Sequence, residues 1–176
     1  LLFHYSCHPT VTDSNFISSE YCGVAAEKIE KWLNDNAVVT FLQGFCGDVR
    51  PKLVQNNEFY RGNEEDVEKF ANQLFEEVKS ILTSKMKHVE CEKITIDNRQ
   101  INLKMNGIPS YEDLHKEITD EECYISEWKR KLRSRKKIEP EIPLDISIFR
   151  VSSDLGFLFA NAEVVCDYGI FVKQVS

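Results

Sequence analysis

The sequence predicts an α/β fold in which a mixed sheet is layered with helices. Three short apolar runs, Leu1-Leu2-Phe3, Val38–Leu42 and Phe157–Ala160, are typical of buried strands. Segments with helical spacing alternate with the first two runs, giving the order strand, helix, strand, helix. Polar residues follow directly after each run, and the strand ends of open α/β sheets are where ligands bind.

The first half of the chain predicts two strands separated by a helix. Residues 1–6 form the first expected strand, and a polar loop leads to a helix over Glu20–Leu33 with its apolar residues on one face. Ser18 or Ser19 can cap that helix. The second strand is expected over Val38–Leu42.

A loop of about 20 residues then leads to Asn63, and loops of this length in a compact domain are often functional. Asn63 is expected to cap a long helix from Glu64 to about Leu82, whose apolar positions recur on one face. This segment completes the predicted β-α-β-α half of the fold.

The second half changes its pattern. Residues 89–105 alternate in the manner of half-exposed strands, with Asp97-Asn98 as a candidate kink or bulge. A charged helical excursion is expected over residues 111–137, ended by Pro140 and Pro143. A hairpin through Ser152–Leu155 and a helix from about Val165 complete the chain. The hairpin strands are expected at Leu144–Val151 and Gly156–Ala160.

The 176 residues, 42% of them hydrophobic, are enough for a single α/β domain over residues 1–176. Because the chain starts inside an apolar run, we expect it to be a portion of a longer protein. The net charge of -7 argues against a nucleic-acid partner. No apolar stretch approaches the roughly 20 residues of a transmembrane helix.

Six cysteines are scattered along the chain without a CxxC pair. In a chain of this size, this pattern predicts reduced thiols and a cytoplasmic location. The even number leaves a secreted, disulfide-bonded form as the alternative.

His8 and Glu163 are the candidate metal ligands, and we expect their site at the strand ends. A neutral imidazole is a good zinc ligand, although a lone loop histidine more often bonds the backbone. A carboxylate among the apolar neighbours of Glu163 needs a partner or a cation, unless it simply occupies the first turn of a helix. His4 is the second-ranked histidine.

The segment Gly44–Pro51 places two glycines and an aspartate directly after a strand. The amide of Gly47 or of a neighbouring residue is expected to support an oxyanion. Asp48 can orient a histidine or cap a turn. Arg50 can bind a carboxylate or phosphate through two hydrogen bonds. Taken alone, the segment is a generic turn.

Three ordered blocks together resemble the neutral/alkaline (non-lysosomal) ceramidase family, in its N-terminal catalytic domain. The first block is Cys7-His8-Pro9-Thr10 with Ile17–Gly23, the second is Phe41–Pro51, and the third is Leu158–Val165. The resemblance implies a zinc amidase that cleaves the N-acyl bond of ceramide, with His8 and Glu163 matching zinc ligands. A further histidine ligand precedes the first block in that family, and a tyrosine ligand follows the last.

The chain departs from the family at Arg50, where the family has its proposed catalytic serine. A guanidinium cannot act as a nucleophile or base, because its pKa exceeds about 12. The leading hypothesis is therefore a zinc-dependent hydrolase of an amide bond, in a sphingolipid-like or smaller anionic substrate. The alternative is a ligand-binding relative that keeps the fold without catalysis. A structural interaction domain built on residues 111–137 has only the charge pattern in its favour.

Overall fold

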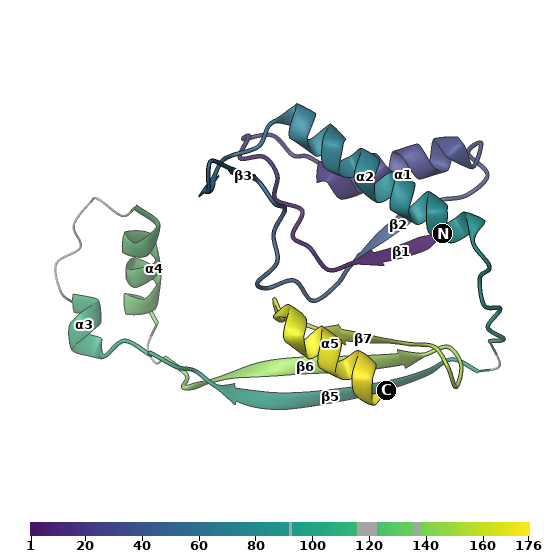
Figure 1. Cartoon of the computed structure of the whole chain (residues 1–176). Coiled ribbons are helices and arrows are strands. Elements are labelled where there is room, and N and C mark those ends of the chain that lie inside the picture. Colours follow the sequence, from purple (N-terminus) through teal and green to yellow (C-terminus); the bar gives the residue numbers. More distant parts are fainter. Residues whose placement is uncertain (92, 116–122, 136–137) are drawn as a thin grey trace. The chain divides into compact units, whose positions relative to one another are not determined.

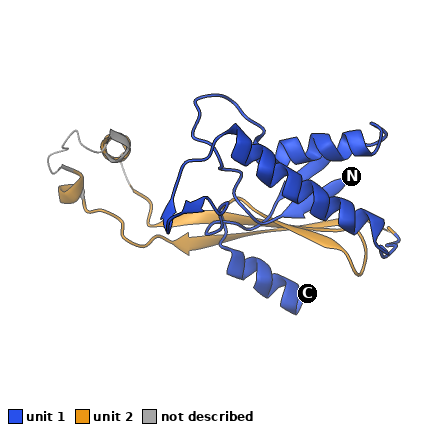
Figure 2. Ribbon diagram, turned by 45° about the horizontal axis from the view of Figure 1, so that its top comes forward, with its two compact units in different colours: residues 1–90, 163–176 blue, residues 91–162 orange. Residues whose placement is uncertain are grey.

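The computed structural model describes residues 1–91, 93–115, 123–135 and 138–176. These residues divide into two compact units, one of Leu1–Glu90 with Glu163–Ser176 and one of Cys91–Ala162 (Figure 2). Helices and small sheets alternate along the chain, which confirms an α/β-like fold at the coarse level (Figure 1). The described strands form three separate sheets instead of the one mixed sheet expected. A single domain over residues 1–176 stays a prediction.

The first unit is built on two parallel strands and two helices (Figure 1). Strand β1 (Leu2–Tyr5) pairs in parallel with β2 (Thr40–Gln43), so that Phe3 lies opposite Phe41. The helices are α1 (Glu20–Trp32) and α2 (Glu64–Thr83), both close to their predicted bounds. A parallel pair needs a crossover between its strands, and α1 supplies it.

Two clusters of buried side chains hold the first unit together. One joins β1 to both helices through Phe3, Ile29, Val39 and Val78. The other joins each of the two helices to the loop that precedes it. Its buried members are Val11, Tyr21, Cys22, Ala25, Leu53, Val67 and Ala71.

The two helices begin differently. Asn63 caps α2 as predicted: its side chain accepts from the backbone N–H of Asp66, and the Asp66 carboxylate accepts from the N–H of Asn63. At α1 the cap residue Ser19 makes no side-chain bond to the helix. Ser18 Oγ instead accepts from the N–H of Glu20 at 2.9 Å.

The long loop between β2 and α2 contains a small hairpin of β3 (Val54–Gln55) and β4 (Glu58–Phe59). Asn56 and Asn57 form its two-residue turn with φ values of 54° and 64°. Asparagine tolerates this left-handed backbone better than most residues, and two such residues suit a tight hairpin.

The second unit contains an antiparallel sheet in the order β5-β6-β7, formed by Thr95–Lys104, Glu141–Arg150 and Gly156–Ala160. The predicted hairpin is confirmed. A bulge at Asp97-Asn98, one of the two expected forms, is absent, because β5 pairs with β6 in unbroken register. Pro143 was predicted to end a helix but lies inside β6. There β6 pairs only with β5, since its pairing with β7 starts at Ile146, so the missing N–H of proline is tolerated.

The charged excursion over residues 111–137 is helical where it is described, in α3 (Tyr111–His115) and α4 (Cys123–Arg133). Residues 116–122 and 136–137 of that prediction lie outside the described residues. On α4, Lys131 pairs with Glu127 at 2.9 Å, as expected for charges balanced within one exposed helix. The last helix, α5 (Cys166–Val175), belongs to the first unit. Among the described helices, none combines the length and apolar character needed to cross a membrane.

Candidate functional site

The parallel pairing of β1 and β2 brings the first two sequence blocks to the same edge of the small sheet. Both strands point the same way, so the loops that carry His8 and Gly44–Pro51 leave from neighbouring carboxyl ends. Two main-chain bonds join these loops. The N–H of Gly44 donates to Tyr5 O at 3.0 Å, and the N–H of His8 donates to Val49 O at 2.9 Å.

The third block reaches the same loop. The N–H of Gly47 donates to Val164 O at 2.9 Å, and Asp48 Oδ1 accepts from the N–H of Cys166 at 2.7 Å. A Cβ atom on Gly47 would lie 2.5 Å from the carbonyl oxygen of Glu163. The close approach of these two segments therefore requires glycine at this position.

The connection that brings Glu163 to this loop differs from the one that the sequence predicted. We expected it at the end of a strand in the same sheet as β1 and β2. The strand before it, β7, instead lies in the separate three-stranded sheet, and the turn between β7 and α5 carries Glu163 to the Gly47 loop. Its side chain is exposed, whereas His8 is half-buried.

The N–H of Gly47 is used differently from our prediction. We expected this amide or a neighbouring one to support an oxyanion, and in the structure the Gly47 donor is occupied by its hydrogen bond to Val164 O. Gly47 thus acts in the structure as a docking point for the chain around Glu163.

Asp48 fixes the beginning of α5. The cap residue of that helix, Val165, has no side-chain acceptor, and the Asp48 carboxylate takes this place from a distant loop. The hydrogen bond from Cys166 lowers the pKa of Asp48. In turn, the thiol of Cys166 lies 3.4 Å from Asp48 Oδ2, and this contact raises the pKa of the thiol. Asp48 therefore joins the loop after β2 to the first turn of α5.

Within the described residues, no group of three or more His, Cys, Asp and Glu side chains is placed to hold a metal ion. His8 and Glu163 would be two donors of the right chemical type on adjoining segments. His4, the second-ranked histidine, lies elsewhere, with its imidazole over Gly44. Burial, and to a smaller extent the nearby Lys173, lowers the pKa of His4.

Arg50 contacts an aromatic ring of the small hairpin between β2 and α2. Its guanidinium carbon lies 4.8 Å from the centre of the Phe59 ring, a cation–π contact with strand β4. The side chain is exposed, and its binding of an anion stays a prediction.

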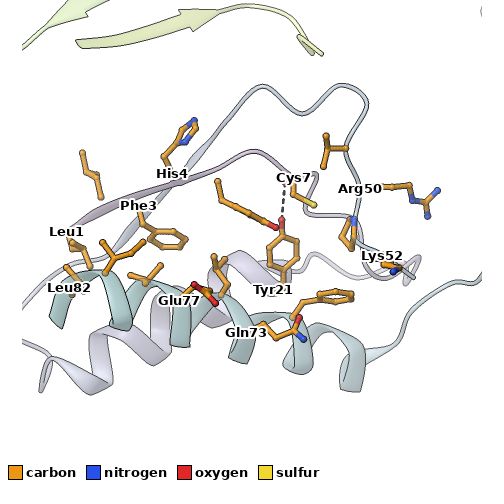
Figure 3. A pocket seen from close by; sticks show the side chains of 18 of the residues that line it. Leu1, Phe3, His4, Cys7, Tyr21, Arg50, Lys52, Gln73, Glu77 and Leu82 are labelled. Atoms are coloured by element: carbon orange, nitrogen blue, oxygen red, sulfur yellow. Dashed lines mark hydrogen bonds between the residues drawn. The ribbon is translucent and has the colours of Figure 1, made fainter. Parts of the chain in front are cut away.

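A cavity of about 660 Å³ lies between β1 and α2 in the first unit (Figure 3). Most of its lining is apolar, and Arg50 and Lys52 stand together at its edge. Inside it, the hydroxyl of Tyr21 donates to Cys7 O at 3.0 Å. The lining includes Cys7, the neighbour of His8, but neither His8 nor Glu163.

Two contributors to the site escaped the sequence reasoning. The backbone of Val164 and Cys166 provides the contacts to Gly47 and Asp48, and Gln43 Nε2 lies 3.2 Å from Cys7 O. Backbone contacts across more than one hundred residues leave no trace in residue type. Gln43 lies inside the second sequence block, directly before the loop. Its position in the sequence could therefore have marked it as a candidate.

Comparisons with family models, curated proteins and solved structures find no match to this chain. The residues and their geometry are therefore the basis for a functional proposal.

Proposed function

We propose that this chain belongs to a metal-dependent hydrolase that cleaves an amide bond, with His8 and Glu163 as zinc ligands. The proposal rests on one observation: the segments of both residues are bonded to the same loop, at Val49 and Gly47. The resemblance of the three sequence blocks to neutral/alkaline ceramidases agrees with this assignment.

The donor set fits zinc in chemical type, because imidazole and carboxylate are both common zinc ligands. Catalytic zinc sites usually have three protein ligands, and this chain offers two candidates. A bound zinc ion lowers the pKa of a coordinated water to about 7 and polarises a carbonyl group. Around it, Asp48 and Gly47 would hold the Glu163 segment in place, and Arg50 would bind the anionic part of a small-molecule or lipid substrate.

The test is metal analysis and amide hydrolysis by the protein at its natural full length. We expect about one bound zinc per chain, lost in His8→Ala and Glu163→Gln. His88→Ala is the matched control, since His88 is exposed and distant in sequence from the loop. Zinc content that is the same in His8→Ala and in the unmodified protein would refute the assignment.

A ligand-binding relative without catalysis is the second candidate. Arg50 supports this second candidate for two reasons. It stands where the family that the chain resembles has a serine, and it lines an apolar cavity. Turnover of any N-acyl lipid or small amide in a substrate panel supports the hydrolase. Saturable binding of such compounds without turnover, weakened by Arg50→Ala, supports the binder.

A further inference from the structure

Gln43, the last residue of β2, touches both strand ends beside the candidate site. On the β1 side, its Nε2 atom lies 3.4 Å from Tyr5 O and 3.2 Å from Cys7 O. On its own side, the same atom lies 3.2 Å from Gly44 O and 3.1 Å from Cys46 Sγ. A single side-chain amide therefore spans the gap between the two loops.

The side-chain amide of Gln43 is a donor placed among acceptors. An amide NH₂ group has two hydrogens, so it can donate to two of these four acceptors at one time. Cys7 directly precedes His8, and Cys46 directly precedes Gly47. Tyr5 and Gly44 each lie two residues further back in the chain. The contacts thus join the two chain segments that lead to the hydrogen bond between His8 N and Val49 O.

We propose that Gln43 is a positioning residue that fixes the His8 loop against the loop of Gly47 and Asp48. The claim that Gln43 positions a zinc ligand rests on the proposed function. The claim that Gln43 holds the two loops together does not depend on it. Without the amide, the two loops would be joined mainly by the backbone bonds at Gly44 and His8, and the second of these would open more often.

The test replaces the donor and keeps the shape. Glu has nearly the same shape as Gln, but its carboxylate accepts hydrogen bonds and cannot donate them. In Gln43→Glu we expect the His8 amide hydrogen to exchange about tenfold faster by NMR, while amides in the middle of α2 keep their rates. Gln73→Glu, the same change on α2, should leave the His8 rate unchanged.

Two results would overturn the proposal: an unchanged His8 exchange rate, or equal acceleration at His8 and in α2, which would indicate only a loss of global stability. Gln43→Met, which is neutral, similar in length and without a donor, replaces the Glu variant if the added charge prevents folding.

Zinc titration separates this inference from the proposed function. If the unmodified full-length protein binds zinc, Gln43→Glu should weaken the affinity about tenfold. If it binds none, the proposed function fails and hydrogen exchange alone decides the role of Gln43.

Discussion

The carboxylate of Asp48 accepts a hydrogen bond of 2.7 Å from the backbone of Cys166, a residue 118 positions further along the chain. The residue before Asp48, Gly47, donates to Val164 O, two residues before Cys166. The two bonds bracket the segment that follows Glu163, so the loop after β2 determines where this acidic residue lies. The part of the chain between the two partners includes the whole second unit.

Replacing Asp48 by Ala should loosen the first turn of α5, because the N–H of Cys166 then loses its acceptor. We expect the Cys166 amide to exchange about fivefold faster, as for the loss of a typical helix N-cap. Asn keeps one acceptor oxygen, so Asp48→Asn should show a smaller effect. Asp167→Ala, at an exposed acidic position in the same turn, is the control. Equal exchange rates in Asp48→Ala and the unmodified protein would contradict the capping role.

The same contact should depend on pH. The hydrogen bond from Cys166 lowers the pKa of Asp48 below its usual value of 3.8. A carboxylate with a lowered pKa stabilises the folded state above its unfolded pKa, and this contribution is lost as the pH falls through its folded pKa. The protection factor of the Cys166 amide should therefore be constant from neutral pH to about pH 4 and should fall below it. In Asp48→Asn this change should disappear.

Gly47→Ala should displace the Glu163 segment, since the added Cβ would lie 2.5 Å from a backbone oxygen that has no flexible side chain to yield. We expect a loss of about 1–3 kcal/mol in the free energy of unfolding, measured by urea denaturation. The matched control is Gly169→Ala in α5, where the added Cβ would meet Phe45 at an ordinary 3.5 Å. That variant should be as stable as the parent or more stable, because alanine favours a helix. Similar losses in both variants would remove the steric explanation.

Local signals in the sequence were enough to predict the elements. Apolar spacing placed α1 and α2 within a residue or so of their bounds, and Asn63 marked the start of α2 because its side chain can bond the first turn. The period of two over residues 89–105 predicted β5, and the Ser152–Leu155 turn predicted the β6–β7 hairpin. Each of these features depends on residues close together in the chain.

The assembly of the elements could not be predicted by the same reasoning. An apolar run such as Phe157–Ala160 fits equally well in a parallel or an antiparallel sheet, so its sheet could not be assigned. The docking of Val164 on Gly47 uses only backbone atoms, which every residue type provides. Asn56-Asn57 did carry a turn signal, because two residues that tolerate positive φ suit a hairpin, and it identifies β3 and β4 in retrospect.

Glu20 should prove important for stability. Its buried carboxylate accepts from the N–H of Val11 and from both the N–H and the hydroxyl of Thr12, at 3.0–3.1 Å. Its φ of 53° is unusual for a residue with a side chain, so the backbone adopts a costly conformation to make these bonds. Glu20→Ala leaves buried donors without a partner and should lower the free energy of unfolding by about 2–3 kcal/mol. Glu27→Ala, exposed on the same helix, should change it by less than about 0.5 kcal/mol. Equal effects in urea denaturation would show that the Glu20 bonds add nothing.

Leu53 should anchor the long loop between β2 and α2. Its side chain has no exposed surface and packs in the cluster that contains Val11 and Ala71, while the next residue, Val54, is 38% exposed. Leu53→Ala removes buried methyl groups and leaves a cavity, so we expect a loss of about 2–5 kcal/mol in the free energy of unfolding. Val54→Ala should cost less than about 1 kcal/mol, because that side chain is already partly in water.

Since Leu53 follows Arg50 by three residues, Leu53→Ala should also increase protease cleavage in the loop. A loop that stays resistant in Leu53→Ala would show that the backbone bonds alone keep it in place.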